Sequence, residues 1–520
     1  MLRKSLGIAE GKVGRRSEQP DIEPVRPGRL AARFGVASDY EPVRTSRRVR
    51  VIQQNTLAAR PTTSKEIGPG SPTEELEAPS LKQAANNKLR LKRGHGLAYA
   101  ALFTFTVVLY ARPAEFYPSP LTASLALIVA LATLAFFIPT QLSLEGTLTA
   151  RPPEVNLVLL FCLTGLLSIP LALNRAIAWQ EFNGTFIRCI VMFIVIVNVV
   201  RTKARLKGLL LLALAAGVWL SVEAVNDYRL GLMTVEGYRV GGRGGGIFGN
   251  SNDMALFLVT IVPIAIALLL SSRGLARKIL FAAAALLMVF AIVLTYSRGG
   301  FIGLLVALTF FAWKAGRRRR LGIVIAGFLI VALFMAAVPS YALRLASILI
   351  PSLDPVGSSG ARSGELLRSL VVAIRHPIFG IGMGNYAPEM SHRGLVTHNS
   401  YTQVAAEMGV AALLCYTLFI VTPLRKLGQI ARQAFGAKAD SDFYYLSLGL
   451  QASLIGYLVC SFFASVAYLW YAYYLIGYAV CLRRLYESET GKAVVVEQRS
   501  KRRRVKAASM IDHNRGVATT

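Results

Sequence analysis

Residues 254–297 read MALFLVTIVPIAIALLLSSRGLARKILFAAAALLMVFAIVLTYS, and this stretch decides the class of fold. It holds two apolar runs, 254–272 and 279–297, separated by Arg273–Lys278, a gap of six residues of which three are basic. Each run is close to the roughly 20 residues with which a helix crosses a bilayer. The stretch therefore predicts a helical hairpin that spans a membrane twice.

Further apolar runs continue on both sides of this hairpin. They fall at 97–111, 121–139, 155–173, 185–200, 208–224, 299–313, 321–338, 401–422, 444–465 and 469–485. The last two form a block too long for one crossing. We divide it near Ala467, because the tyrosines and tryptophan of 468–474 are typical of an interfacial aromatic belt. We expect an all-α, polytopic integral membrane protein with about 12 transmembrane helices and a helical extracytoplasmic loop.

The composition of the whole chain agrees with this class. Of its 520 residues, 54% are hydrophobic and 17% are charged, which is too apolar for a soluble globule of that length. The net charge of +30 lies in the tails and in short gaps between apolar runs, so it indicates a basic cytoplasmic face and no nucleic-acid partner. The five cysteines lie in apolar stretches without C-x-x-C spacing, so we expect neither a disulfide framework nor a zinc site.

Three segments are expected along the chain. Residues 1–95 and 487–520 are predicted to be disordered basic tails, and 96–486 a transmembrane domain. No short apolar segment near Met1 resembles a signal peptide. Alternate threading places the most basic gaps and both tails on one side, which we assign to the cytoplasm. The other side receives 112–120, 174–184, 225–253, the turn at 297–298 and a long periplasmic loop, 339–400.

The predicted outer segments contain many arginines and no lysine. The arginines are Arg112, Arg175, Arg229, Arg239, Arg243, Arg298, Arg344, Arg362, Arg368, Arg375 and Arg393. A guanidinium grips phosphate oxygens in pairs and never loses its charge, so an arginine-only outer face suggests a phosphate or diphosphate ligand. The alternative is that they bind lipid headgroups or form ion pairs with Glu181, Glu223, Asp227, Glu365 and Glu389.

Two short motifs stand out among these segments. Arg298 lies in Thr295–Gly300 between two runs with almost no loop, so its turn is expected to be recessed, where a charge is costly and usually functional. Snorkelling to the interface is the competing explanation. Gly241–Asn252 surrounds Arg243 with glycines, and Asn250 or Asn252 is expected to cap the helix that follows. A flexible glycine loop without function is the alternative there.

The loop 339–400 has two helical patterns and leads to a histidine. Tyr341–Ile350 is apolar and expected along the membrane interface. Arg362–Arg375 carries a leucine-rich face that should pack as a lid over the outer helix ends. Gly380–Gly384 lacks a βαβ context, so no nucleotide site is expected. His398 opens the run that contains Glu407 and can exchange protons near neutral pH, although interfacial histidines are more often hydrogen-bonders.

These motifs resemble the O-antigen ligase/polymerase superfamily. His398, Asn399 and Gly409 have the spacing of that family's histidine, polar residue and glycine. Arg243 and the stretch Gly246–Asn252 are similar to an arginine followed by Gly-x-Phe-Gly-Asn-x-Asn. The turn with Arg298, and Arg362 ahead of 377–384, also resemble the family. The likeness covers roughly 200–425 and excludes the long N-terminal tail.

The resemblance implies a glycosyltransferase of the bacterial inner membrane, with both termini cytoplasmic. It would move a sugar chain from an undecaprenyl-diphosphate carrier to an acceptor glycan or glycolipid, without cofactor or metal. Arg243 and Arg298 would stabilise the diphosphate and His398 would orient or deprotonate the acceptor hydroxyl. The predicted substrate-binding residues are Arg362, Asn250, Asn252, Asn399 and Glu407. Ligase and polymerase, in O-antigen or exopolysaccharide synthesis, share these residues.

Two other classes of function stay open. A polysaccharide or lipid-linked glycan flippase would need charged groups near the middle of several spans, and Arg188 is the main candidate of that kind. A structural scaffold of a polysaccharide assembly complex is the third possibility, with the basic N-terminal tail as its docking segment.

Overall fold

The computed structural model describes residues 94–233, 235, 237–242, 246–315, 327, 358–436 and 441–491. Contacts divide the chain into Met1–Leu76 and Glu77–Thr520, and every described residue belongs to the second unit. Arg243, Arg344, the run 321–338, the predicted interfacial helix 341–350 and nearly all of both predicted tails lie outside the described residues.

The described residues are helical, with one isolated bridge between Val235 and Arg239 in place of any strand. The first half comprises α2 (Gly96–Ala111), α3 (Pro113–Phe116), α4 (Pro120–Glu145), α5 (Pro153–Ser168), α6 (Arg175–Glu181), η2 (Phe182–Phe186), α7 (Ile187–Val199) and α8 (Lys203–Arg229). The second half comprises η3 (Gly246–Phe248), α9 (Ser251–Ser271), α10 (Leu275–Leu294), α11 (Arg298–Lys314), α14 (Ser358–Arg375), η5 (Tyr386–Met390), α15 (Ser400–Gly436), α16 (Ser441–Cys460) and α17 (Trp470–Thr490).

Eight helices of the described chain are long and apolar enough to cross a membrane. They are Gly96–Phe116, Pro120–Glu145, Arg175–Val199, Lys203–Arg229, Ser251–Ser271, Leu275–Leu294, Ser400–Phe435 and Asp442–Cys460. The predicted all-helical, multi-span fold is therefore confirmed, including the hairpin of α9 and α10. The count of about 12 spans stays a prediction.

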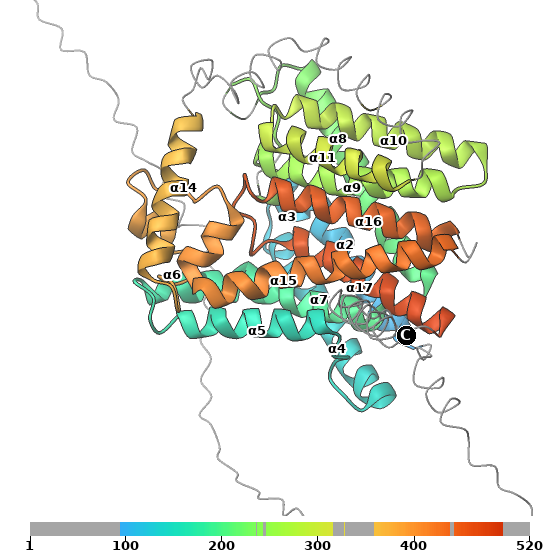
Figure 1. Cartoon of the computed structure of the whole chain (residues 1–520), viewed down its shortest axis with the longest axis horizontal. Coiled ribbons are helices and arrows are strands. Elements are labelled where there is room, and N and C mark those ends of the chain that lie inside the picture. Colours follow the sequence, from blue (N-terminus) through green and yellow to red (C-terminus); the bar gives the residue numbers. More distant parts are fainter. Residues whose placement is uncertain are drawn as a thin grey trace, which may run out of the picture. The chain divides into compact units, whose positions relative to one another are not determined.

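The helix α9 lies at the centre of the packing. It contacts α16, α10, α11 and α8, and Figure 1 shows α9, α10, α11, α15 and α16 side by side. Glycines allow the closest approaches: a Cβ on Gly449 would lie 2.7 Å from the Cβ of Ala267 and 2.9 Å from the carbonyl oxygen of Pro263. Small residues at such crossings are what membrane helices use to bring their backbones together.

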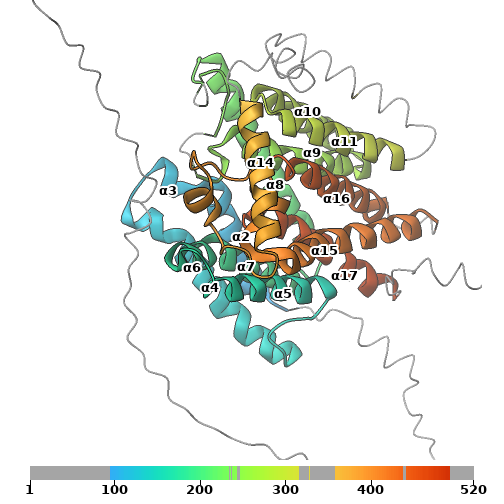
Figure 2. The same cartoon turned by 60° about the vertical axis from the view of Figure 1, so that its left-hand side comes forward.

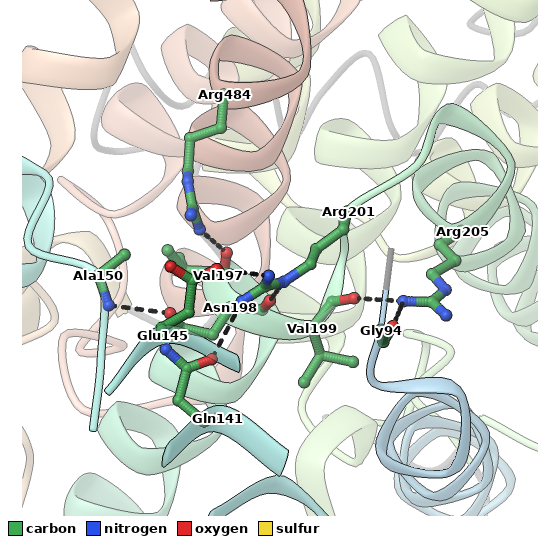
Figure 3. Close-up of polar contacts among 10 residues, drawn as sticks. All are labelled: Gly94, Gln141, Glu145, Ala150, Val197, Asn198, Val199, Arg201, Arg205 and Arg484. Carbon is green, nitrogen blue, oxygen red and sulfur yellow. Dashed lines mark hydrogen bonds and ion pairs between the residues drawn. The ribbon is translucent and has the colours of Figure 1, made fainter. Parts of the chain in front are cut away.

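The predicted cytoplasmic gaps meet at one end of these helices. There Lys203 pairs with Glu489 (2.8 Å) and Lys207 with Asp442 (2.5 Å). Figure 3 shows Arg201, Arg205 and Arg484 directed at the C-terminal carbonyls of α7, to which each donates a hydrogen bond. The last carbonyls of a helix have no partner within it, and the negative end of its dipole attracts cations. The basic gaps thus hold helix ends together.

The predicted outer segments meet at the opposite end. The α14–α15 connection contacts the segment after α5, where the backbone N–H of Leu173 donates to the carbonyl of Ile381 (3.0 Å). The same connection joins the 461–469 segment between α16 and α17, because the N–H of Ser400 donates to Ser461 (2.9 Å). Figure 2 shows α14 in front, beside α15. Three of the predicted outer segments therefore lie together in the described part of the chain.

The aromatic block near Ala467 does not form an interfacial belt, so that prediction was wrong. Tyr468, Tyr473 and Tyr474 are buried. The ring of Tyr468 packs 5.5 Å from that of Phe186, and the ring of Tyr473 packs 5.8 Å from that of Phe419. The 461–469 connection enters the helix core, where aromatic side chains bury large areas against one another.

Candidate functional site

His398 occupies a strained backbone position at the outer end of α15. Its φ of 52° is left-handed, which is uncommon for a residue other than glycine. The conformation is held from both sides: the Thr397 hydroxyl donates to the carbonyl of Asn399 (2.9 Å) and lies 2.8 Å from the hydroxyl of Ser465. Asn399 itself caps α15, with its side-chain oxygen accepting from the N–H of Tyr401 (2.9 Å) and Thr402 (3.0 Å).

Electrostatics place Arg362 and Glu365 beside His398, more than 30 residues away in sequence. Burial lowers the pKa of His398 from 6.5 to about 4; the positive charge of Arg362 adds to this and Glu365 opposes it. The half-buried imidazole is consequently neutral around pH 7 and offers one nitrogen as a hydrogen-bond acceptor.

Glu365 joins α14 to η5 through hydrogen bonds with Tyr386. Its carboxylate accepts hydrogen bonds from the Tyr386 hydroxyl (2.8 Å) and from Arg368 (2.9 Å), and only 4% of the residue is exposed. Burial, and then Glu365, raise the pKa of Tyr386. Arg368 therefore forms an ion pair with Glu365, as the alternative to a phosphate ligand predicted. Arg362 is half-buried on the same helix.

The face by which α14 packs is the opposite of the predicted one. Leu367, Leu370 and Ile374 are 66%, 42% and 76% exposed, whereas Val372 and Ala373 pack against Ile381, Tyr386, Ala405 and Ala406. Small side chains and the Glu365–Tyr386 hydrogen bond allow a closer approach to α15 than a leucine face would. The predicted helix is present and packs on α15, but its leucine stripe points away from α15; that it covers the outer helix ends stays a prediction.

Glu407 and Gly409 shape the junction between α15 and the segment before His398. Gly409 has φ 85°, and a Cβ there would lie 2.2 Å from the carbonyl oxygen of Ile378. The helix breaks at this point, and the carbonyl of Glu407 accepts from the N–H of Gly382 (2.9 Å) instead of continuing the helical pattern. The Glu407 carboxylate is 3% exposed and accepts from the N–H of Tyr386 (3.4 Å). Glu407 therefore anchors the 376–386 segment.

Asn252 and Ser297 join two other outer segments into a second part of the site. The side-chain oxygen of Asn252 accepts from Arg239 (2.8 Å) and from the Ser297 hydroxyl (2.9 Å). Arg239 also donates to the carbonyl of Thr295 (2.9 Å) and is 2% exposed. Arg239 was one of many outer arginines in the sequence; only the fold singles it out. Asn250 is the N-cap of α9, accepting from the N–H of Asn252 (2.9 Å), which confirms the predicted cap.

Arg298 begins α11 directly after this recessed turn. Thr295, Tyr296 and Ser297 are buried, and Arg298 is half-buried. A cation in the first turn of a helix is disfavoured by the helix dipole, and an anion bound beside it offsets that cost. Gly299 and Gly300 serve protein packing: a Cβ on either would lie 2.8 Å from Phe463 or 2.7 Å from Ala255.

The 461–469 connection brings the two parts of the site to one place. On one side Phe463 packs on Gly299, next to Arg298, and the Cys460 thiol donates to the Gly299 carbonyl (3.5 Å). On the other side Ser465 touches Thr397, and the N–H of Val466 donates to the Ser400 hydroxyl (2.9 Å). Arg298 and His398 therefore border the same short segment, although 100 residues separate them in the sequence.

Arg112 is an arginine of the predicted outer segments that forms ion pairs within the protein, as the alternative to a phosphate site expects. Its guanidinium pairs with Glu115 (3.1 Å) and Glu223 (3.4 Å) and lies over the rings of Phe116 and Phe248. Its side chain is 2% exposed. A guanidinium held by two carboxylates and two rings is a structural element that ties α2, α3, η3 and α8 together.

Comparison with known proteins identifies part of this region. Residues 283–417 match the family model described as O-antigen ligase. The matched segment runs from within α10 into α15 and contains Arg298, Arg362, His398, Asn399 and Glu407. Asn250, Asn252 and Arg243 precede it. No curated protein matches the chain at a significant level.

Proposed function

We propose that this chain, whose residues 283–417 match the O-antigen ligase family model, transfers a sugar chain from an undecaprenyl-diphosphate carrier to an acceptor hydroxyl. The proposed site comprises Arg298, Arg362 and His398, at the predicted outer face. The observation that carries the proposal is the 461–469 connection, which borders both the Arg298 turn and the His398 turn.

The donor's diphosphate is proposed to lie against Arg298. As the bond between the anomeric carbon and the phosphate oxygen breaks, its electron pair stays on the leaving diphosphate, where negative charge grows. A guanidinium and the positive end of α11 stabilise that charge more in the transition state than in the ground state. Arg243, which the structure does not describe, is proposed from the sequence as the second cation.

The acceptor hydroxyl is proposed to lie against His398. The neutral imidazole accepts a hydrogen bond from the hydroxyl and orients its oxygen toward the anomeric carbon. As the new carbon–oxygen bond forms, the hydroxyl proton passes to the imidazole and then to water. Burial, with an added contribution from the charge of Arg362, keeps the imidazole unprotonated before the reaction. Arg362 is proposed to hold an anionic group of donor or acceptor.

The test replaces His398 with alanine in the full chain. Protein reconstituted into proteoliposomes would receive an undecaprenyl-diphosphate-linked oligosaccharide and an acceptor glycolipid, and product would be followed by mass spectrometry. We expect His398→Ala to lower transfer about 100-fold or more, the usual contribution of a positioned acid–base group. His392→Ala, an exposed histidine of the same connection, should stay within about twofold of the wild type.

Carrier translocation measured in the same vesicles separates the transferase from a flippase. Loss of transfer with unchanged translocation of the carrier supports the proposal. Transfer retained in His398→Ala would remove His398 from the mechanism, and loss of translocation alone would favour transport.

A further inference from the structure

A cavity lies at the predicted cytoplasmic end of the helices. It has a volume of about 410 Å³ and is lined by Lys207 and Leu211 of α8, Leu268 and Ser271 of α9, Ser272 and Arg273 after it, Arg277 and Phe281 of α10, and Asp442 of α16. Such a volume is within the range of small-molecule sites. Because α9 is 21 residues long, this end lies about 30 Å from Asn252 at the other. The cavity is therefore separate from the proposed transfer site.

The cavity wall carries more positive than negative charge. Lys207 is paired with Asp442 (2.5 Å), the one acid among the lining residues of the described chain. Within the part of the chain that the structure describes, neither Arg273 nor Arg277 takes part in an ion pair. Two guanidinium groups on one concave wall repel each other, and an anion between them removes that repulsion.

The start of α10 adds to the preference for an anion. This helix of 20 residues, Leu275–Leu294, has Gly274 as its N-cap, so no side chain caps it, and its first turn has no acidic residue. The backbone N–H groups of its first turn have no partner within the helix and carry the positive end of the helix dipole. The dipole also disfavours the positive charge of Arg277 in that turn, and a bound anion would offset this cost. The hydroxyls of Ser271 and Ser272 line the same cavity. The first backbone N–H groups of α10 and the Arg277 guanidinium can donate to a phosphate oxygen, whereas the Ser271 and Ser272 hydroxyls donate to the carbonyl of Leu268 (3.2 and 2.7 Å).

The remaining walls are apolar and belong to membrane-spanning helices. Leu211, Leu268 and Phe281 lie on α8, α9 and α10, each of which is long and apolar enough to cross a bilayer. A ligand that fits both walls has a phosphate at one end and hydrocarbon at the other. This combination favours a lipid over a soluble phosphate compound, because basic pockets between membrane helices recognise anionic headgroups.

We propose that this cavity binds the phosphate headgroup of an acidic phospholipid, held by Arg273, Arg277 and Lys207, with its acyl chains along Leu211, Leu268 and Phe281. The site does not rest on the proposed transferase function. It would hold one lipid where α8, α9, α10 and α16 come together.

The test uses delipidated full-length protein in detergent, titrated with dioctanoyl phosphatidylglycerol or dioctanoyl phosphatidylcholine and followed by native mass spectrometry. The wild type should bind the acidic lipid at least about tenfold more tightly than the zwitterionic one. Arg273→Gln with Arg277→Gln should remove that difference. Lys278→Gln with Arg432→Gln changes the charge equally at exposed positions outside the cavity and should keep it.

A variant expected to bind the acidic lipid more tightly shows that a loss of binding in the other variants is not caused by misfolding. Asp442→Asn removes the negative charge from the wall and should tighten binding of the acidic lipid about threefold or more. Equal binding by the wild type and the Arg273/Arg277 variant would overturn the proposal, as would an equal loss in the Lys278/Arg432 control. Glycerol 1-phosphate should compete only at concentrations about 100-fold higher than the lipid; competition at equal concentration would assign the cavity to a soluble phosphate compound and overturn the lipid assignment.

Discussion

At the scale of single residues, His398 combines a constrained backbone with a neutral ring. The left-handed φ is maintained because its neighbours Thr397 and Asn399 are both buried and hydrogen-bonded. A side chain that projects from such a turn is held in one direction, which positions an acceptor hydroxyl without loss of entropy at the moment of reaction. Its low pKa has a physical cause in burial and in Arg362.

A prediction for pH dependence follows from that cause. The pKa of His398 is lowered to about 4, so it is neutral above roughly pH 5, and kcat/KM for transfer should be flat with respect to this group from pH 6 to 8. Arg362→Gln removes a charge that lowers the pKa, so the acid limb of the profile should move to higher pH. Arg375→Gln, at the exposed end of α14, should leave the midpoint in place.

The two variants are to be compared by their midpoints, because Arg362 is also proposed to hold substrate and its loss lowers the rate at every pH. An acid limb that moves to lower pH in Arg362→Gln, or by as much in Arg375→Gln, would contradict the assignment of the limb to His398.

At the scale of elements, the break in α15 positions the site more than any one side chain. The helix is interrupted at Gly409, and the freed carbonyls of Ala406 and Glu407 accept from the N–H groups of Ile381 and Gly382, both at 2.9 Å. This pairing fixes the 376–386 segment, which in turn carries the Tyr386 hydroxyl to Glu365 on α14. The family spacing between His398 and Gly409 thus has a backbone explanation.

The prediction at this scale is Gly409→Ala. The substitution meets a positive φ of 85° and an oxygen 2.2 Å from the new Cβ, so we expect a loss of about 2–4 kcal/mol in the free energy of unfolding and loss of transfer. Thermal unfolding in detergent measures the first effect. Gly428→Ala, in the same helix and at an ordinary helical φ, meets only the side-chain oxygen of Gln451 at 3.2 Å and should change stability by less than about 1 kcal/mol. Equal effects of the two variants would refute the explanation.

At the scale of the whole described unit, opposite ends of the helices have different tasks. Both ends contain buried ion pairs, but the predicted outer end also carries the half-buried Arg298, Arg362 and His398. Glu154, fully buried on α5, accepts two hydrogen bonds from Arg483 of α17 (2.8 and 2.9 Å) and one from Lys426 of α15 (3.2 Å). The arginine cluster of Figure 3 lies at the same end.

The prediction at this scale is that the two ends can be perturbed separately. Glu154→Gln leaves two buried cations without their carboxylate, which costs about 3–5 kcal/mol of stability. Glu145→Gln should cost less, because the Glu145 side chain is 36% exposed and Arg201 keeps its hydrogen bonds to Gln141 and to the carbonyl of Asn198. Calorimetry of both variants in detergent measures the difference. The transfer rate per folded Glu154→Gln molecule should stay within about twofold, and a much lower rate would show that this end belongs to the site.

The sequence by itself determined the class of fold, the hairpin of α9 and α10, and the resemblance to the O-antigen ligase family that residues 283–417 confirm. These depend on long apolar runs, on charge in the gaps and on short motifs such as Gly246–Asn252 and His398–Gly409, all of which are local properties of the chain. The cap of α9 by Asn250 was predictable for the same reason, since a cap involves only neighbouring residues.

Only the tertiary structure decided which arginines are already satisfied and which face of each element is buried. Arg112 needed Glu223 from another helix, α14 packs by its small residues, and the tyrosines after Ala467 enter the core. Arg239 and the 461–469 connection gained importance only through partners far away in the sequence. In a membrane, both lipid and core are apolar, so hydrophobic periodicity loses its power to distinguish them, and shape and polar pairing decide.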